Sequence, residues 1–254
     1  MTVVGVLHPG EMGAAVAGAL SARGETVLWA SAGRSAATAG RAEAAGLEDA
    51  GDVEEVCRRC EILLSICPPH AALEVARAAS GFTGIYVDAN AIAPDTARAV
   101  AELQPRLVDG GIVGPPPTGP GTTRLYLSGG GAAEVVALFS VTNVEARVIS
   151  EQVGAASALK AAYAGWTKGS AALLLTVREL ARAEGVENAL LEEWRLSIPE
   201  LEERLAGAGR SARRKGWRWI GEMEEIAHSM AAQDLPTGFH EASAEVFRRA
   251  AEES

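Results

Sequence analysis

The sequence predicts an α/β fold in which a doubly wound sheet is followed by an all-α domain. Short apolar segments alternate with helical patterns over the first 150 residues, and no convincing strand follows residue 150. A glycine-containing loop separates the first apolar segment from the first helical one. We therefore expect two domains, residues 1–150 and 151–254, which agrees with a length of 254 residues.

The expected elements occur in the order that such a sheet requires. Strands are predicted at Val3–Leu7, Thr26–Trp29, Ile62–Ile66, Ile85–Val87, Leu107–Val108, Leu125–Leu127 and Ala146–Ile149. Helices are predicted between them at Ala14–Arg23, Val53–Arg59, Ala71–Ala79, Thr96–Leu103 and Ala133–Phe139. In the second domain, breaks between helices are expected at Gly185, Pro199, Gly207–Gly209 and Leu235–Gly238.

The composition excludes several classes of protein. A formal net charge of −10 and a sequence pI near 5.0 argue against a nucleic acid or an anionic membrane as a partner. No apolar stretch approaches the roughly 18 residues that span a bilayer, and no basic segment precedes the first apolar run, so a cytoplasmic protein is expected. Cys57 and Cys60 have the spacing of a redox pair, but no second pair completes a zinc site. We expect a structural role for them and no bound metal.

The segment His8-Pro-Gly10-Glu11-Met12-Gly13 lies where a dinucleotide fingerprint belongs, between a strand and its helix. There the free N–H groups of the helix N-terminus hold a pyrophosphate. Gly10 allows close approach of the phosphate, and Gly13 allows tight packing of the helix on the strand. His8 replaces the first glycine of the fingerprint and is interpreted as a satisfied loop residue. These features predict a Rossmann-type domain in which the loop, including Glu11 and Met12, binds the cofactor.

The end of the second strand indicates which cofactor binds. NAD-binding domains place an acidic residue there, which accepts hydrogen bonds from the ribose. Here the segment after Trp29 contains no acid, whereas Ser31, Arg34 and Ser35 can donate to a 2′-phosphate. We therefore predict NADP as the cofactor; the alternative for this segment is a solvated turn.

Two further loops follow strands at their carboxyl ends, where open α/β sheets bind ligands. We expect Cys67 and Pro68 to line the adenosine-ribose side of the cofactor site. Asn90 is expected to reach the nicotinamide ribose or its carboxamide. A plain strand-to-helix turn is the alternative in both places.

These motifs together resemble the β-hydroxyacid dehydrogenases of the 6-phosphogluconate-dehydrogenase-like superfamily, and most closely its branch with a small helical C-terminal domain. Gly10-Glu-Met-Gly13 matches the second half of the family's G-x-G-x-M-G, and Asp109-Gly-Gly-Ile-Val-Gly114 falls where the family carries D-A-P-V-S-G-G. Gly154-x-Ala-x-x-x-Lys160 matches G-x-G-x-x-x-K. The resemblance implies that Lys160 is the catalytic acid/base.

The sequence also departs from this family. Val113 stands at the position of the substrate-binding serine, and Pro115 stands at the second glycine after it. Ala164 replaces the asparagine that lies four residues beyond the lysine. The proton-transfer group is kept while two polar contacts to substrate are lost. We therefore expect a substrate other than a standard small β-hydroxy acid.

Lys160 opens a long helical segment directly after the cofactor domain. Helical spacing places a small residue, the lysine and two hydroxyl side chains on one face: Ala156, Lys160, Tyr163 and Thr167. With NADP bound, neutral Lys160 would take the alcohol proton in oxidation, and protonated Lys160 would supply it in reduction. Burial and the positive nicotinamide ring are expected to lower its pKa. No other charge lies between Ala155 and Tyr163, which argues against the alternative of a solvated helix lysine.

The expected substrate contacts come from several segments of the chain. They are Ile112, Val113, Gly114, Thr118, Tyr163, Thr167 and His240. For His240, a plain position at the start of a helix is the alternative.

The sequence thus predicts an NADP-dependent oxidoreductase that acts on a hydroxy acid or a related alcohol or carbonyl. The alternatives are an NADPH-dependent imine reductase, which usually has another residue at the lysine position, and a non-catalytic NADP-binding protein. Leu173-Leu-Leu-Thr-Val177 is apolar nearly all round, and such a helix is buried on every side. We therefore expect a homodimer formed through the helical domain, as the resemblance also implies.

Overall fold

The computed structural model describes residues 2–252 and divides into two compact units, residues 1–160 and 161–254. The long helix α7 (Ala155–Ala183) runs through this division. The first unit is built on a sheet, and every element described in the second unit is a helix. This arrangement confirms the predicted fold class.

The first unit contains one sheet of eight strands in the order β3-β2-β1-β4-β5-β6-β7-β8. The strands from β1 to β6 pair in parallel, whereas β7 is antiparallel to β6 and parallel to β8. The strands are β1 Val3–Val6, β2 Thr26–Trp29, β3 Glu48–Asp49, β4 Ile62–Ser65, β5 Ile85–Asp88, β6 Leu107–Val113, β7 Thr123–Ser128 and β8 Val144–Ser150.

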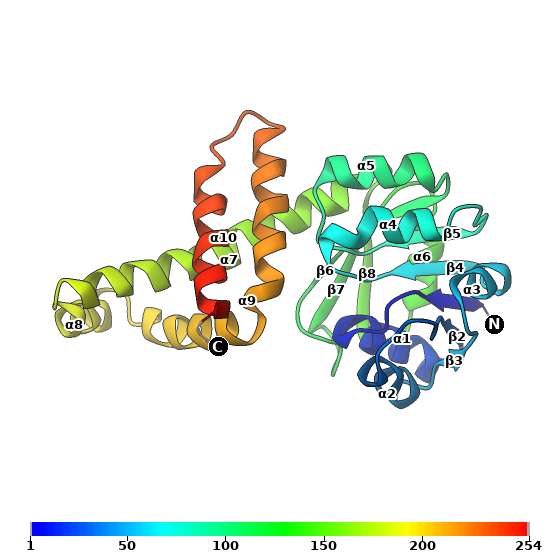
Figure 1. The fold of residues 1–254 in the computed structure, drawn as a ribbon, viewed down its shortest axis with the longest axis horizontal. Coiled ribbons are helices and arrows are strands. Elements are labelled where there is room, and N and C mark those ends of the chain that lie inside the picture. The colour runs from blue at the N-terminus through cyan, green and yellow to red at the C-terminus, as the bar shows by residue number, and fades with distance from the viewer. Residues whose placement is uncertain (1, 253–254) are drawn as a thin grey trace. The chain divides into compact units, whose positions relative to one another are not determined.

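Helices cover both faces of this sheet (Figure 1). They are α1 Glu11–Arg23, α2 Ala36–Ala44, α3 Val53–Arg59, α4 Ala72–Ala78, α5 Pro94–Leu103 and α6 Ala132–Phe139, with a 3₁₀ turn at Pro69–Ala71. Buried side chains of α1 and α6 form one core cluster with the strands. Those of α3, α4 and α5 form a second cluster on the opposite face. Two separate apolar layers around one sheet are the mark of a doubly wound fold.

Strand β6 is longer than the predicted Leu107–Val108 and continues to Val113. Two central glycines, Gly110 and Gly111, hid this part of the strand from prediction, because a pair of glycines is typical of a turn. Glycine is required at both positions, since neighbouring backbone segments leave no room for a side chain. A Cβ on Gly110 would lie 3.0 Å from the Asp88 carbonyl oxygen, and one on Gly111 would lie 2.9 Å from the Ala156 carbonyl oxygen. Glycine inside a strand commonly marks such a close approach of another backbone.

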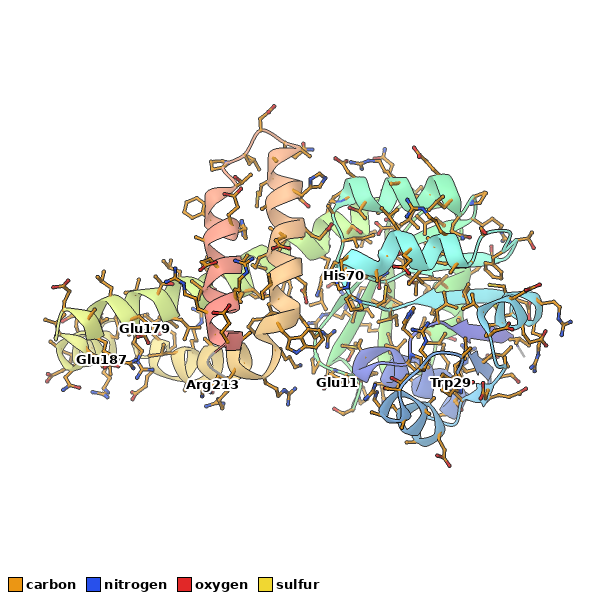
Figure 2. All side chains as sticks on the ribbon, viewed as in Figure 1. Glu11, Trp29, His70, Glu179, Glu187 and Arg213 are labelled. Atoms are coloured by element: carbon orange, nitrogen blue, oxygen red, sulfur yellow. The ribbon has the colours of Figure 1, made fainter. Side chains whose placement is uncertain are left out.

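The second unit consists of the rest of α7 with α8 (Glu187–Ser197), α9 (Leu201–Ala231) and α10 (Gly238–Glu252). Its small core is rich in alanine and includes Ala164, Ala172, Ala212, Met223, Ile226, Ala244 and Phe247. Trp219 packs edge-on against Phe247 with 5.0 Å between ring centroids. The turn between α7 and α8 is stabilised by ion pairs from Arg178 and Arg182 to Glu187, which Figure 2 labels together with Glu179.

The predicted breaks at Gly185, Pro199 and Leu235–Gly238 are confirmed, but the one at Gly207–Gly209 is wrong. Helix α9 continues through these glycines. Each interior glycine costs a helix about 1 kcal/mol relative to alanine. The buried side chains of Leu205, Ala208 and Ala212 form one packed face here, and this packing overrides the local preference. In the described part of the chain, no helix is long and apolar enough to cross a membrane.

Candidate functional site

The loops predicted to bind the cofactor gather at one edge of the sheet. Strands β1, β2, β4, β5 and β6 are parallel, so their carboxyl ends meet along this edge. The chain passes from β1 to β2 on one side and returns to β4 on the other, which makes the ends of β1 and β4 a topological switch point. Open α/β sheets bind their ligands at such a point.

The glycine loop joins β1 directly to α1. The Gly10 N–H donates to the His8 carbonyl oxygen at 2.8 Å, and Gly10 is the N-cap of α1. A Cβ on Gly13 would lie 2.3 Å from that same carbonyl oxygen, so the helix packs against the strand only with glycine here. A Cβ on Gly10 would meet nothing within 4 Å, which leaves open space at the helix N-terminus. Glu11, labelled in Figure 2, is exposed, while Met12 packs against the core.

The loop after β2 holds the predicted NADP-selecting residues. The Ser35 hydroxyl accepts from the Thr38 N–H and caps α2, so this side chain is already used by the fold. The Arg34 N–H donates to the Ser31 carbonyl oxygen at 3.0 Å. The Nε atom of Arg34 is buried and has no hydrogen-bond partner among the described residues. Of the three predicted residues, Arg34 therefore has an unused donor suited to an anion.

A second arginine, Arg41, was not predicted and lies beside the glycine loop. Arg41 on α2 donates from Nε to the Pro9 carbonyl oxygen at 3.3 Å and from Nη2 to Thr38 Oγ1 at 3.0 Å. These bonds connect α2 to the loop that precedes α1. Arg41 follows Arg34 by seven residues, but Arg34 lies before the Ser35 N-cap of α2, so helical spacing does not relate the two side chains.

Cys67 and Asn90 lie together, on the loops after β4 and β5. The Cys67 N–H donates to Asn90 Oδ1 at 2.5 Å, and Asn90 Nδ2 donates to Ser65 Oγ at 3.1 Å. The Asn90 side chain thus ties the two loops to each other. Burial raises the pKa of the Cys67 thiol to about 12, with the nearby Asp88 carboxyl adding to the shift. This thiol therefore stays protonated at neutral pH. Pro68 follows on the same loop and is exposed.

Burial has the same effect on the CxxC pair. It raises the pKa of Cys57 to about 11 and that of Cys60 to about 12. All three cysteines are free thiols. Protonated thiols do not attack as nucleophiles, which agrees with a structural role for this pair.

Asp88 is a fully buried carboxyl group at the end of β5. Its Oδ1 accepts from the Asn90 N–H at 3.0 Å, while its Oδ2 is buried without a partner among residues 2–252. Burial raises the pKa of Asp88 to about 7, and the charge of Asp109 on the neighbouring strand contributes to the shift. Asp88 thus stays largely protonated below neutral pH. It lies next to the Asn90 loop, whose N–H it binds.

Asp109 anchors the N-terminus of helix α7 to the sheet. Its Oδ2 accepts from Ser128 Oγ at 2.9 Å and from the N–H groups of Gly154 and Ser157 at 3.0 Å each. Its Oδ1 accepts from Ser157 Oγ at 2.6 Å. A buried carboxylate thereby satisfies donors that the first turn of a helix leaves open, and it also complements the positive end of the helix dipole. The start of α7 is therefore fixed on β6.

This anchor sets the position of Lys160, which is half-buried in the second turn of α7. Its Nζ donates to the Ile112 carbonyl oxygen at 2.7 Å. A Cβ on Gly111 would lie 3.0 Å from the Lys160 Cβ, so glycine is required for this approach. The lysine amine is thus held at the carboxyl end of β6, on the same edge as the cofactor loops.

Four predicted substrate residues belong to the end of β6 and the loop after it. Ile112 and Val113 are buried in the strand. Gly114 has φ +113°, and a Cβ there would lie 2.1 Å from the Thr122 carbonyl oxygen, so only glycine fits. Thr118 is exposed in the loop before β7. Of these four residues, Ile112 contacts Lys160 through its carbonyl oxygen. Val113, Gly114 and Thr118 follow it in the chain.

Three predicted substrate residues belong to the helical unit. Tyr163 is 47% exposed, and the Thr167 hydroxyl donates to the Tyr163 carbonyl oxygen of its own helix at 3.0 Å. His240 lies in the first turn of α10 and is buried, with Nε2 3.4 Å from the Gly165 carbonyl oxygen. His240 therefore packs α10 against α7 within this unit.

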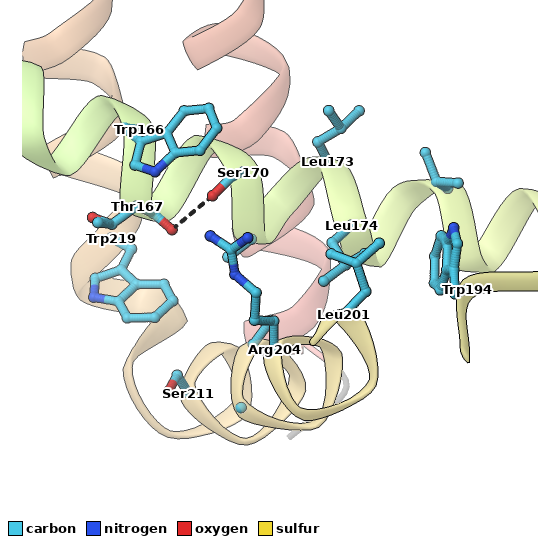
Figure 3. Close-up of a pocket in the computed structure, with 14 residues that line it drawn as sticks. Trp166, Thr167, Ser170, Leu173, Leu174, Trp194, Leu201, Arg204, Ser211 and Trp219 are labelled. Carbon is cyan, nitrogen blue, oxygen red and sulfur yellow. Dashed lines mark hydrogen bonds between the residues drawn. The ribbon is translucent and has the colours of Figure 1, made fainter. Parts of the chain in front are cut away.

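The helical unit also contains an apolar pocket of about 520 Å³ (Figure 3). Helices α7, α8 and α9 line it, and Trp166, Trp194 and Trp219 supply aromatic walls. The guanidinium of Arg204 extends into it (Figure 3). Among the predicted site residues, only Thr167 lines this pocket.

Comparisons with known proteins agree with the architecture. The family described as a domain of unknown function (DUF1932) matches residues 181–250, within the helical unit. A curated relative, an uncharacterized 28.5 kDa protein of Methanothermus fervidus, is 28% identical over 210 residues, which are 78% of this chain and 81% of the relative.

Solved structures of similar fold include dehydrogenases and reductases. A conserved protein of unknown function, described as structurally similar to 3-hydroxyacid dehydrogenases, is 28% identical with a TM-score of 0.74, covering 98% of this chain and 97% of that one. The 3-hydroxyisobutyrate dehydrogenase of Mycobacterium tuberculosis is 17% identical with a TM-score of 0.72 (100% and 94% covered). A reductive aminase of Aspergillus terreus, solved with NADPH and ethyl levulinate, is 22% identical with a TM-score of 0.64 (100% and 95% covered). The chain has the fold of NAD(P)-binding dehydrogenases.

Proposed function

We propose that this chain is an NADP-dependent oxidoreductase that transfers hydride between the nicotinamide and a hydroxy acid or a related alcohol or carbonyl. The observation that carries the proposal is the position of Lys160. Its amine donates to the Ile112 carbonyl oxygen at the edge of the sheet where the glycine loop and Asn90 also lie. An acid/base group and a cofactor loop on one edge are what a hydride-transfer site requires.

The residues present fit a dinucleotide phosphate. The space at Gly10 and the N-terminus of α1 suit a pyrophosphate, and the unpartnered Nε of Arg34 suits a 2′-phosphate. No acidic residue follows β2 directly to accept from ribose hydroxyls, since the chain continues Ala30-Ser31-Ala32-Gly33-Arg34. NADP, when bound, supplies or takes the hydride.

Lys160 would then move the proton that accompanies the hydride. The Ile112 carbonyl oxygen orients its amine, and the half-buried position limits access of water. In reduction, the ammonium group donates a proton to the developing alkoxide, and in oxidation the neutral amine removes the alcohol proton. Val113 and Ala164 offer no polar side chain, so recognition of the substrate relies on other groups or on apolar contact.

The cofactor assignment predicts that NADPH binds at least tenfold more tightly than NADH. Arg34 pairs with a 2′-phosphate that only NADPH carries, and such a charged hydrogen bond contributes about 1.5–3 kcal/mol. Fluorescence titration with both cofactors measures the ratio. Arg34→Ala should bring it close to one, while Arg77→Ala, on α4, should leave it unchanged. Equal dissociation constants in the wild-type protein would remove the assignment.

Two alternatives share this architecture. One is an NADPH-dependent imine reductase; the likeness to the reductive aminase, at 22% identity, shows that the two chains share a fold. A non-catalytic NADP-binding protein is compatible with the lost serine and asparagine equivalents. NADPH consumption against a panel of keto acids, ketones and preformed imines separates the three. Consumption with imines only favours the reductase, and consumption with none of the panel favours the binding protein.

We also propose a homodimer formed through the helical unit. Trp166, Leu173 and Leu180 follow one another at seven-residue intervals on α7 and are 68%, 64% and 62% exposed. This spacing gives one apolar seam along the helix, as in helices that pair with another helix. A second copy of this chain is the partner that offers the same seam.

Light scattering tests the assembly. At micromolar concentration we expect twice the 26.3 kDa mass of one chain. Leu173→Glu should shift the protein toward the monomer because it buries a charge in the seam. Glu179→Lys, on an exposed position of the same helix, is the matched control. A wild-type mass of one chain would refute the dimer.

A further inference from the structure

His8 is the residue of the glycine loop that departs from the dinucleotide fingerprint. It occupies the position of the first glycine, two residues after the end of β1 and two residues before Gly10, the N-cap of α1. Its carbonyl oxygen accepts from the Gly10 N–H at 2.8 Å and packs against Gly13. The backbone of the loop therefore keeps its tight turn, and the imidazole is an addition to it.

The interpretation of His8 as a satisfied loop residue is wrong. Its Nδ1 atom is buried and has no hydrogen-bond partner among residues 2–252, and the same is true of Arg34 Nε. Leaving buried polar atoms unpaired is costly, and native proteins do so rarely. One buried nitrogen on each of two different loops thus has no partner among residues 2–252, beside the turn proposed to hold the cofactor phosphates. Such an arrangement suits an anionic ligand that both can bind.

Burial, together with the positive charge of Arg34, holds His8 neutral while no anion is present. Burial lowers its pKa to about 4, and the positive charge of Arg34 contributes to the shift. Arg41, which donates to the Pro9 carbonyl oxygen, adds a second positive charge on this side.

Two further titratable groups lie on segments next to the loop. The thiol of Cys67, after β4, is neutral because burial raises its pKa to about 12. Glu11, at the start of α1, is exposed to solvent. A negative charge brought next to the imidazole reverses the balance, because an opposite charge within about 4–6 Å favours the protonated form.

We propose that His8 is an additional ligand for the cofactor phosphates and takes up a proton as they bind. This inference rests on the proposed binding of NADP. Protonation gives the imidazole a second N–H donor, which can donate a hydrogen bond to a phosphate oxygen. It also gives the ring a positive charge, which attracts the negative phosphate. Cofactor affinity consequently falls as pH rises, by up to about tenfold per pH unit between the pKa of free His8 and its higher value in the complex.

The experiment follows the imidazole directly. The chain contains four histidines, so their ring Cε1–H signals can be resolved by NMR, and His8→Asn identifies the signal of His8. Spectra are recorded from about pH 7.5 down to about pH 5, with and without saturating NADP⁺. In the free protein the His8 signal should stay in its neutral position. In the complex it should move to the protonated position as pH falls.

Calorimetric titration with NADP⁺ over the same pH range gives the second readout. The NADP⁺ affinity of the wild-type protein, divided by that of His8→Asn, should decrease as pH rises. The affinity of His8→Gly, divided by that of His8→Asn, should stay constant over the same range. A His8 signal that stays neutral in the complex, with NADP⁺ bound, overturns the inference and leaves the proposed function intact. A failure of NADP⁺ to bind at any pH overturns both.

Discussion

Replacement of Lys160 by methionine is expected to lower turnover by several orders of magnitude, about 10²–10⁴-fold, while NADPH binding stays intact. Methionine retains the length and apolar stem of lysine but carries no proton. The amine that donates to the Ile112 carbonyl oxygen disappears, whereas the glycine loop and the loop after β2 are untouched. The loss should therefore fall on kcat, with the dissociation constant of NADPH unchanged.

Initial rates of NADPH oxidation, with the best substrate of the carbonyl and imine panel, measure this effect. Lys160→Arg separates charge from acid/base function, because arginine keeps the positive charge but does not release its proton at neutral pH. It should be nearly as slow as Lys160→Met. Lys215→Met, on α9, removes another lysine and should turn over normally. Near-normal rates for Lys160→Met would eliminate the mechanism.

Replacement of Asp109 by alanine should have the largest effect on stability. The Asp109 carboxylate accepts four hydrogen bonds, two from side chains and two from the N–H groups of Gly154 and Ser157. Without it, four buried donors lose their acceptor and α7 loses its anchor on β6. We expect a loss of about 3 kcal/mol or more, and a fall in the melting temperature of roughly 10 °C. Turnover should fall too, because Lys160 depends on this anchor.

Calorimetry and circular dichroism of the Asp109→Ala protein test the stability. Asp109→Asn keeps one acceptor oxygen and should lose less. Asp88→Asn on the adjacent strand is the comparison: it replaces a carboxyl that the folded chain keeps protonated by an amide of similar shape, so it should not lower the melting temperature. Near pH 6 it should raise that temperature, because the unfolded chain no longer gains from ionising this residue. If Asp109→Ala melts at the wild-type temperature, the hydrogen-bond network has no structural importance.

The alternation of apolar runs predicted most of the sheet and its helices, because buried parallel strands read as short apolar segments. It missed the strand β3, whose two residues Glu48 and Asp49 are exposed and carry no apolar pattern. It also missed α2, in which only Ala42 is buried. Elements that bury almost nothing leave no periodicity to detect.

The loops of the candidate site follow from motif position, but the pairing of their side chains does not. Asp109 meets the N–H of Ser157, 48 residues later in the chain, and the sequence gives no sign of this contact. The length of β6 was also hidden, since Gly110 and Gly111 resemble a turn until the neighbouring backbones are in place. The position of Arg41 could not be predicted either, because its hydrogen bond to the Pro9 carbonyl oxygen depends on how α2 packs beside the glycine loop.

Asp88 makes folding a proton-consuming step. The folded chain keeps this carboxyl protonated up to about pH 7, whereas its usual value of 3.8 lets an unfolded chain release the proton much earlier. Between these pH values the native protein carries one negative charge fewer than its sequence would give. Its free energy of unfolding declines as pH rises through this window and levels off above it. Mild acid therefore favours the native state through this residue, opposite to the usual behaviour of an aspartate in an ion pair.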